Sequence, residues 1–315
     1  MERDDFCGRV AFALGTGRCG TTFLYRVLSL EPSVASWHER HRFSDAFHRY
    51  CQWYSLPVDP AGFLAIREAD IREDLAKRRV SFESNAYLAF SVLELYQRFD
   101  ARFILLVRRP DKVVNSYIEK GWYAQPLVRS DLDLPPGYQP GARSRHHPLS
   151  RIAPIGPEAI RWEGYSRVGK LAWFWRSLNG RVLELFRELP ETHWRVVRLE
   201  DLSLEEYHSI AVFLGIESSL TPKQYQSVVM ERPNRSHRVV SAVDWDEKEA
   251  EEFEKEVSEL AARFGYEWRV AALRKAATSV SENRKPPMKI RVKSRAREIV
   301  RSWKRGVQGR PVKRK

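Results

Sequence analysis

The sequence predicts an α/β fold in which two layers of helices enclose a central parallel sheet. Short apolar runs alternate with longer amphipathic segments along the chain, a pattern typical of doubly wound sheets. One of these runs, Val10–Leu14, leads directly into the glycine-rich segment Gly15–Phe23, as a strand, a turn and a helix would. With 315 residues, 43% of them hydrophobic, the chain can bury a sizeable core.

Five short apolar runs are the expected strands. They cover residues 10–14, 34–37, 80–85, 102–107 and 194–199. The clearest is RFILLV at 102–107, because strands buried on both faces of a parallel sheet are almost continuously apolar.

Helices are expected between and after these strands. Their residues are 23–28, 42–56, 63–79, 87–98, 165–189, 205–214 and 247–264, with one more beginning near residue 111. The aromatic segments 43–54 and 171–178 are predicted to belong to the core rather than to a substrate platform.

The segment 124–160 breaks this pattern. It is rich in proline and glycine and has no periodicity, so we expect a long loop. Loops of this length in compact domains often serve as lids or binding loops. The predicted organisation is therefore a main domain at 1–268, with 124–160 as a substrate lid or insertion, followed by a basic tail at 269–315.

The charge of the chain is concentrated in that tail. The net charge is +13, but residues 269–315 hold 17 basic and two acidic side chains, a net of +15 that leaves the rest at −2. A linker is expected over 278–287 and a basic helix over 288–305. Such a tail is by default a solvated extension, and the apolar stripe of its helix favours an anionic membrane surface as an alternative. Nucleic acid would also attract it, but no sequence-reading motif accompanies it.

The number of cysteines and the length of the apolar runs indicate the cellular compartment. Three cysteines fit a reducing environment better than a disulfide framework. The sequence has no signal-peptide core and no apolar run of about 20 residues. We expect a cytoplasmic protein, with peripheral contact at the inner membrane face through the tail.

The glycine-rich segment predicts an anion site. The free amides of a first helical turn point at whatever oxyanion lies before it. Gly15 and Gly20 have the Gly-x4-Gly spacing of a Walker A loop, which makes the expected three-layer αβα fold P-loop-like. Thr21, however, stands where that motif has lysine, and a cation lies inside the loop instead, at Arg18.

A second positive group follows the expected strand at 102–107. A nucleoside-triphosphate site would place a carboxylate at such a strand end to hold Mg²⁺. The chain has Arg108 and Arg109 there. Cations repel a metal ion and attract a second anionic group, so the site is predicted to work without a metal. The alternative is that Arg108 and Arg109 are solvated or salt-bridged charges at the end of the strand and bind no ligand.

Together these motifs resemble the sulfotransferases that use 3'-phosphoadenosine 5'-phosphosulfate (PAPS). Arg18–Phe23 (RCGTTF) is similar to the family's 5'-phosphosulfate loop. Arg108-Arg109-Pro110, with Ser116 eight residues after the first arginine, is similar to its 3'-phosphate element. Arg198–Leu202 (RLEDL) is similar to a further strand end, so the resemblance spans about residues 9–266.

Two residues of the loop depart from the family's usual pattern. Many members have lysine at the position of Arg18, and serine is usual at the position of Cys19. Cys19, at the start of a helix, is open to two interpretations: a reactive thiol of low pKa, or a small residue in place of serine.

The resemblance implies a role for each motif. Arg18 would neutralise the charge that develops on the bridging oxygen as the sulfonate leaves. Phe23 would pack on the adenine, while Arg108 and Ser116 would bind the 3'-phosphate. The implied donor-binding set is Gly17, Arg18, Cys19, Gly20, Thr21, Thr22, Phe23, Arg108, Ser116 and Arg235. Arg235 is the candidate from a basic loop late in the chain. The Arg-Lys-Gly pattern that the family usually has in this loop is absent.

Removing the proton of an acceptor hydroxyl or amine requires a general base. His38 and Glu39, at the end of the second expected strand, are the candidates, and adjacent strand residues point to opposite faces. We favour Glu39, with Glu83 at the end of the third strand in reserve. A surface turn or a structural hydrogen bond is the alternative for this pair.

The predicted function is transfer of sulfonate from PAPS to a carbohydrate, a glycolipid or another small-molecule acceptor. The alternative enzyme is a P-loop kinase of a small molecule. The non-enzymatic alternative is a protein that binds its partners through the basic tail.

Overall fold

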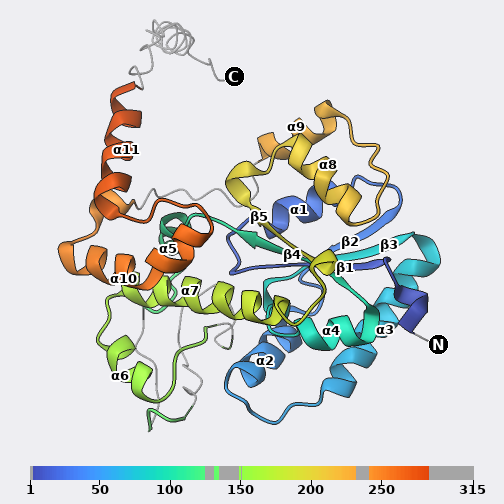
Figure 1. Ribbon diagram of the computed structural model, residues 1–315, viewed down its shortest axis with the longest axis horizontal. Helices are drawn as coiled ribbons and strands as arrows, with labels where there is room; N and C mark the ends of the chain where they lie inside the picture. Colours follow the sequence, from blue (N-terminus) through green and yellow to red (C-terminus); the bar gives the residue numbers. More distant parts are fainter. Residues whose placement is uncertain (1–2, 125–130, 135–148, 150, 232–240, 284–315) are drawn as a thin grey trace, which may run out of the picture. The chain divides into compact units, whose positions relative to one another are not determined.

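The computed structural model describes residues 3–124, 131–134, 149, 151–231 and 241–283 (Figure 1). The chain divides into two compact units, residues 1–274 and 275–315. All strands belong to the first unit.

The expected central sheet is present, with five parallel strands in the order β2-β3-β1-β4-β5. The strands are β1 (Val10–Leu14), β2 (Val34–His38), β3 (Val80–Ser84), β4 (Arg102–Val107) and β5 (Trp194–Arg198). Each lies within one residue of its expected end. The chain builds from β1 to one edge and then crosses to β4, so the strand order reverses between β1 and β4. Open α/β sheets bind their ligands at the carboxyl end of such a switch point.

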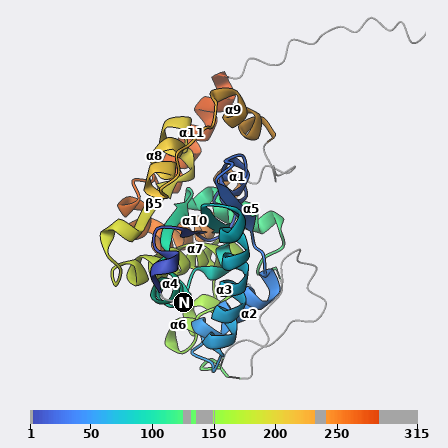
Figure 2. The same ribbon diagram turned by 90° about the vertical axis from the view of Figure 1, so that its right-hand side faces the viewer.

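Helices cover both faces of the sheet, as expected (Figures 1 and 2). Ala11 and Ala13 of β1 pack with the layer of α1, α8 and α9, whereas Phe12 and Leu14 pack with the layer that contains α4 and α7. The helices are α1 (Thr21–Leu28), α2 (Arg42–Trp53), α3 (Pro60–Lys77), α4 (Val92–Phe99), α5 (Pro110–Glu119), α6 (Pro157–Glu163), α7 (Arg167–Phe186), α8 (Leu204–Phe213), α9 (Pro222–Glu231), α10 (Glu247–Arg263) and α11 (Val270–Asn283).

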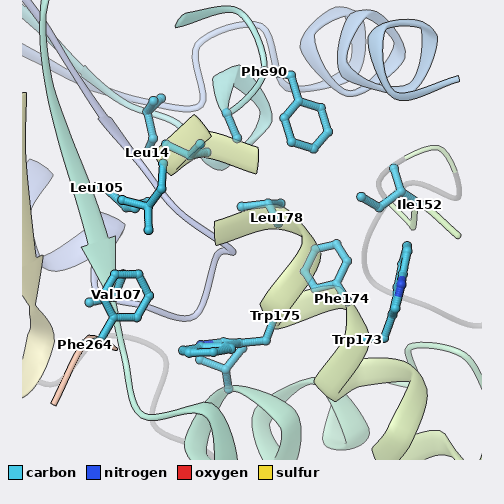
Figure 3. Close-up of a cluster of buried hydrophobic side chains, with 14 of the residues drawn as sticks. Leu14, Phe90, Leu105, Val107, Ile152, Trp173, Phe174, Trp175, Leu178 and Phe264 are labelled. Atoms are coloured by element: carbon cyan, nitrogen blue, oxygen red, sulfur yellow. The ribbon is translucent and has the colours of Figure 1, made fainter. Parts of the chain in front are cut away.

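The long helix α7 supplies three consecutive aromatic residues of the larger core (Figure 3). Trp173–Trp175 and Leu178 are fully buried, in one cluster with Leu14 and Leu105 of the central strands. The core assignment of 171–178 is therefore confirmed. Trp175 also donates from Nε1 to the carbonyl oxygen of Arg108 at 3.0 Å, so α7 is bonded to the strand end that carries the candidate site.

The aromatic segment on α2 is only partly core, contrary to the prediction. Cys51 and Tyr54 are buried, but Phe43 and Phe47 are 61% and 51% exposed. These two residues lie four apart, on an exposed face of α2 that the aromatic composition alone did not reveal.

Three helices were not expected from the sequence. Helix α6 begins inside the segment predicted to be a loop, and its Pro157 occupies a first-turn position, where proline is favourable. Helix α9 follows Thr221, whose hydroxyl accepts the Gln224 amide while the Gln224 side chain accepts the Thr221 amide. Helix α11 runs into the predicted linker. Most of the predicted lid and the basic helix 288–305 lie outside the described residues.

Candidate active site

The loop between β1 and α1 requires glycine at two positions. A Cβ on Gly17 would lie 2.6 Å from Tyr117 Oη, and one on Gly20 would lie 2.6 Å from Leu199 Cδ1. Both glycines have left-handed backbone angles, φ +76° and φ +107°, which a side chain disfavours. Gly20 precedes α1, so the first amides of the helix, from Thr21 onward, have no partners within the helix. The strand, turn and helix expected for an anion site are present.

Arg18 connects this loop to the second sequence motif. Its Nε donates to Ser116 Oγ at 2.8 Å, across 98 residues of sequence. Arg18 has a φ of 60°, a left-handed conformation that costs a residue with a Cβ about 1–2 kcal/mol. Strain of this kind gathers at functional sites. The loop therefore holds a cation in a strained conformation against α5, the helix that follows β4.

Arg108, just after β4, holds the loop from the other side. Its Nη1 donates to the carbonyl oxygen of Arg18 at 3.0 Å. Burial lowers the pKa of Arg108, and the positive charge of Arg18 lowers it as well, while Glu200 opposes both effects. The hydrogen bond from Arg108 to the backbone of Arg18 brings the two cationic residues together at this edge of the sheet.

Arg109 has a different role from Arg108. Its Nε and Nη2 donate to the two carboxylate oxygens of Asp111 on its own helix, each at 3.0 Å. Its amide donates to Glu200, and Tyr266 donates its hydroxyl to the other oxygen of the same carboxylate. Arg109 and Glu200 are therefore used to fix the β4–α5 turn.

Cys19 is a packed residue inside the turn. The residue is fully buried, and burial raises the pKa of its thiol to about 11. A Cβ placed on Gly15 would lie 2.6 Å from its Sγ. A buried thiol with a raised pKa does not fit the interpretation as a reactive thiol and favours the interpretation of Cys19 as a small residue in place of serine.

His38, the last residue of β2, contacts the first turn of α1. Its Nε2 lies 3.1 Å from Thr22 Oγ1. Burial lowers the pKa of the imidazole, and the charge of Arg42 lowers it further. The ring is therefore neutral at pH 7 and able to accept a proton or a hydrogen bond.

Glu39 lies just beyond the strand rather than on it. Its φ is 50°, and its amide donates to the carbonyl oxygen of Ser84 at 3.2 Å. Burial raises the pKa of the Glu39 carboxyl, and the charges of Arg42 and Arg49 partly oppose that rise. The alternation expected for two strand residues does not apply here, because the backbone turns at Glu39.

Glu83 belongs to a buried salt-bridge network. Arg67 bridges Glu83 and Asp45, and all three side chains are at most 7% exposed. The second oxygen of Glu83 accepts the Arg40 amide and the Asn85 side-chain amide, each at 2.9 Å. Both oxygens are therefore engaged, which makes the reserve candidate unsuited to taking a proton. No sequence signal marks this network, since its members come from α2, α3 and β3.

The remaining donor-binding candidates are placed only in part. Phe23 is half-buried, and its ring meets Tyr225 edge to face at 5.7 Å between centroids. Tyr225 belongs to α9, a helix that the sequence analysis missed. Arg235 lies outside the described residues.

The chemistry of this edge of the sheet is that of an anion site. Free helical amides and the side chains of Arg18 and Arg108 suit phosphate or sulfonate oxygens. His38 and Glu39 add proton acceptors at the end of β2, where His38 contacts Thr22 of α1. In the part of the chain that the structure describes, no group of three or more His, Cys, Asp or Glu residues is arranged to hold a metal ion. No described helix is both long and apolar enough to cross a membrane.

The chain is similar to solved structures of sulfotransferases. A sulfotransferase domain from the curacin biosynthetic pathway is 14% identical with a TM-score of 0.47, covering 82% of this chain and 98% of that one. A sulfotransferase domain from the Synechococcus PCC 7002 olefin synthase is 17% identical with a TM-score of 0.44, covering 82% and 95%. Sulfotransferase STF9 from Mycobacterium avium is 13% identical with a TM-score of 0.46, covering 83% and 78%. No protein-family model and no curated protein matches the sequence. Likeness at these scores carries no argument on function, which has to come from the site itself.

Proposed function

We propose that this chain is a sulfotransferase that moves the sulfonate group of PAPS to a hydroxyl or amine acceptor. The observation that carries the proposal is the hydrogen bond from Arg18 to Ser116, which joins the loop after β1 to the helix after β4. A donor with phosphates at its 5' and 3' positions needs two adjoining anion sites. A nucleoside triphosphate needs one such site and a carboxylate for Mg²⁺, whereas β4 ends in two arginines.

In this proposal each motif binds one end of the donor. The loop amides from Gly17 to Gly20, with the hydroxyls of Thr21 and Thr22, bind the 5'-phosphosulfate. Arg108 and Ser116 bind the 3'-phosphate. Support for Arg108 is that its guanidinium makes a single hydrogen bond within the described residues, to the loop, which leaves its other nitrogens for an anion.

The reaction is an in-line transfer. The acceptor oxygen or nitrogen forms a bond to sulfur while the bond from sulfur to the bridging phosphosulfate oxygen breaks. The electron pair of that bond leaves with adenosine 3',5'-bisphosphate, and the acceptor proton goes to a base. Arg18 neutralises the charge that grows on the bridging oxygen, an effect worth about 2.7–4 kcal/mol for one preorganised donor.

Glu39 is the proposed base, and His38 positions the loop through Thr22. A raised carboxyl pKa brings a base closer to the pH at which proton transfer is efficient. His38 is the second candidate because its ring is neutral at pH 7. Its Nε2, however, already contacts the Thr22 hydroxyl, which supports a positioning role.

The test of the donor is thermal unfolding with adenosine 3',5'-bisphosphate and, separately, with ATP and Mg²⁺. We expect the bisphosphate to stabilise the protein without metal, by about 2.7 kcal/mol at 100 times its Kd. Preference for ATP with Mg²⁺ would support the kinase alternative instead.

A matched pair of variants tests the 3'-phosphate assignment. Arg108→Ala should weaken binding of the bisphosphate far more than binding of 5'-AMP. Arg109→Ala is the control, because that side chain is paired with Asp111. Equal losses for the two nucleotides in Arg108→Ala would show that Arg108 does not bind the 3'-phosphate.

We further propose a carbohydrate, glycolipid or small-metabolite acceptor and a cytoplasmic location, with the tail at the anionic inner membrane face. The support for the tail is its charge alone, since residues 284–315 lie outside the described part. Cosedimentation with anionic vesicles should be lost after truncation at residue 283, and sulfonate transfer to a soluble acceptor should survive it. Binding that survives the truncation would contradict this role.

A further inference from the structure

Arg151 is a buried charge whose hydrogen bonds are incomplete among the described residues. The residue is 5% exposed, and its Nε and Nη2 have no hydrogen-bond partner within the described residues. Burial lowers the pKa of this guanidinium below its usual value. Proteins rarely retain such a group unless an anion pairs with it.

Arg67 shows how the same fold treats a structural arginine. It is buried to a similar degree, at 2% exposed, and it forms ion pairs with both Asp45 and Glu83. Arg151 forms no ion pair with any described carboxylate. The contrast indicates that the anion for Arg151 is not among the described side chains.

The backbone beside Arg151 is firmly held. Tyr123 donates its hydroxyl to the carbonyl oxygen of Ile152. The amide of Ala153 donates to Tyr54 Oη, and its carbonyl oxygen accepts from Trp53 Nε1, each at 2.8 Å. Arg151 is therefore fixed on the core rather than carried on an exposed turn.

A second buried arginine connects this position to the candidate site. Trp53 and Tyr54, which bond to Ala153, follow Arg49 by about one helical turn, so Arg49 lies one turn from the contacts that hold the segment of Arg151. Burial raises the pKa of Tyr123, and the charges of Arg151 and Arg49 both oppose that rise. Arg49 is 1% exposed, donates to the carbonyl oxygen of Ala86 at 3.0 Å, and also lowers the pKa of Glu39. Two cations thus lie in one region, with the proposed base at its edge.

We propose that Arg151 and Arg49 form an oxyanion subsite for the acceptor. The inference rests on the proposed function and narrows its substrate class: the acceptor carries a carboxylate, phosphate or sulfate in addition to the hydroxyl or amine that receives the sulfonate. Pairing of the oxyanion with Arg151 leaves the nucleophilic group of the same molecule beside Glu39. An uncharged acceptor would leave Arg151 unpaired in the complex.

The test uses the full chain and inorganic phosphate as the probe. The protein is first saturated with adenosine 3',5'-bisphosphate, so that the loop after β1 is occupied, and phosphate is then titrated by calorimetry at constant ionic strength. We expect one further phosphate site in the wild type. Arg151→Gln should weaken that site about 10- to 100-fold, the range for losing hydrogen bonds to a charged group.

Two additional variants separate binding from folding. Arg181→Gln removes an exposed arginine paired with Glu184 and should leave phosphate binding unchanged. Arg151→Met, like Arg151→Gln, removes an uncompensated buried charge, so neither should unfold at a lower temperature than the wild type without ligands. A structural arginine would give the opposite result.

The sequential titration distinguishes the possible failures. Bisphosphate binding followed by no further phosphate site, or by a site that Arg151→Gln retains, would overturn the oxyanion subsite alone. Failure of the wild type to bind the bisphosphate would overturn the donor assignment and the subsite with it. A lower unfolding temperature of both Arg151 variants, with phosphate binding intact, would assign Arg151 to folding.

Discussion

Replacing Arg18 with glycine and with alanine separates its backbone strain from its role in the site. Arg18 has a φ of 60°, and the left-handed conformation costs a residue with a Cβ about 1–2 kcal/mol. Glycine adopts this conformation without that cost. Both variants lose the 2.8 Å hydrogen bond to Ser116, which contributes about 1 kcal/mol. This loss is common to the pair, so it cancels when the two variants are compared.

At this position we expect the glycine variant to be more stable than the alanine variant, which is the reverse of the usual order. Alanine normally exceeds glycine by about 0.4–1 kcal/mol, because glycine leaves the unfolded chain more freedom. At position 18 the relief of strain is larger than this term, so Arg18→Gly should be more stable than Arg18→Ala by about 1 kcal/mol. For a domain of this size, that difference corresponds to roughly 2–4 °C in Tm.

Calorimetry and a transfer assay check the two halves of this prediction. Both variants should lose sulfonate transfer from radiolabelled PAPS to acceptors in a cell extract by a factor of about 10²–10³. An alanine variant as stable as the glycine variant would show that residue 18 is not strained. A transfer rate near that of the wild type in either variant would remove Arg18 from the reaction.

Two variants and one labelling experiment test other groups around the site. Arg67→Ala leaves two buried carboxylates unpaired and should cost about 3–5 kcal/mol, read from urea unfolding; an unchanged free energy would contradict the network. Glu39→Gln should lower transfer about 10²–10⁴-fold and remove the acid limb of its pH profile. Because burial raises the Glu39 pKa, its charged form destabilises the fold as pH rises through that value, so the glutamine variant should gain relative stability upward from pH 4.5; a constant difference would argue against burial of the carboxyl. Iodoacetamide should label exposed Cys7 but not Cys19 in the native protein, as read by peptide mass spectrometry, and early labelling of Cys19 would contradict its burial.

The sheet and its order of elements could be predicted because its two central strands are apolar runs followed by helical patterns. Val10–Leu14 and Arg102–Val107 are buried almost throughout, as expected for strands in the middle of a parallel sheet. The fold class and all five strands are confirmed for this reason. Helix α9 was missed although it has a local signal: Thr221, Pro222 and Gln224 form a capping box with proline at the first position.

Only those parts of the candidate site whose position depends on the order of the strands could be predicted from the sequence. The loop after β1 and the end of β4 lie at the carboxyl edge of the same parallel sheet, so the proximity of these two segments follows from topology, whereas the hydrogen bond between Arg18 and Ser116 is seen only in the structure. The roles of the two arginines after β4 do not follow from topology. The side chain of Arg109 donates to Asp111, whereas that of Arg108 donates to the loop. That choice depends on side-chain packing that no spacing in the sequence encodes.

The pairing of buried charges distinguishes structural from functional groups better than position at a strand end does. Glu83 and Glu39 both lie at carboxyl ends of strands, and the sequence offers no reason to separate them. In the structure Glu83 has both oxygens engaged by Arg67 and its neighbours, and these bonds fix the end of β3. That fixed strand end in turn holds the backbone of Glu39, whose amide is bonded to Ser84. A saturated network therefore supports a carboxyl that burial leaves with a raised pKa, which is the reason why we propose Glu39 rather than Glu83 as the base.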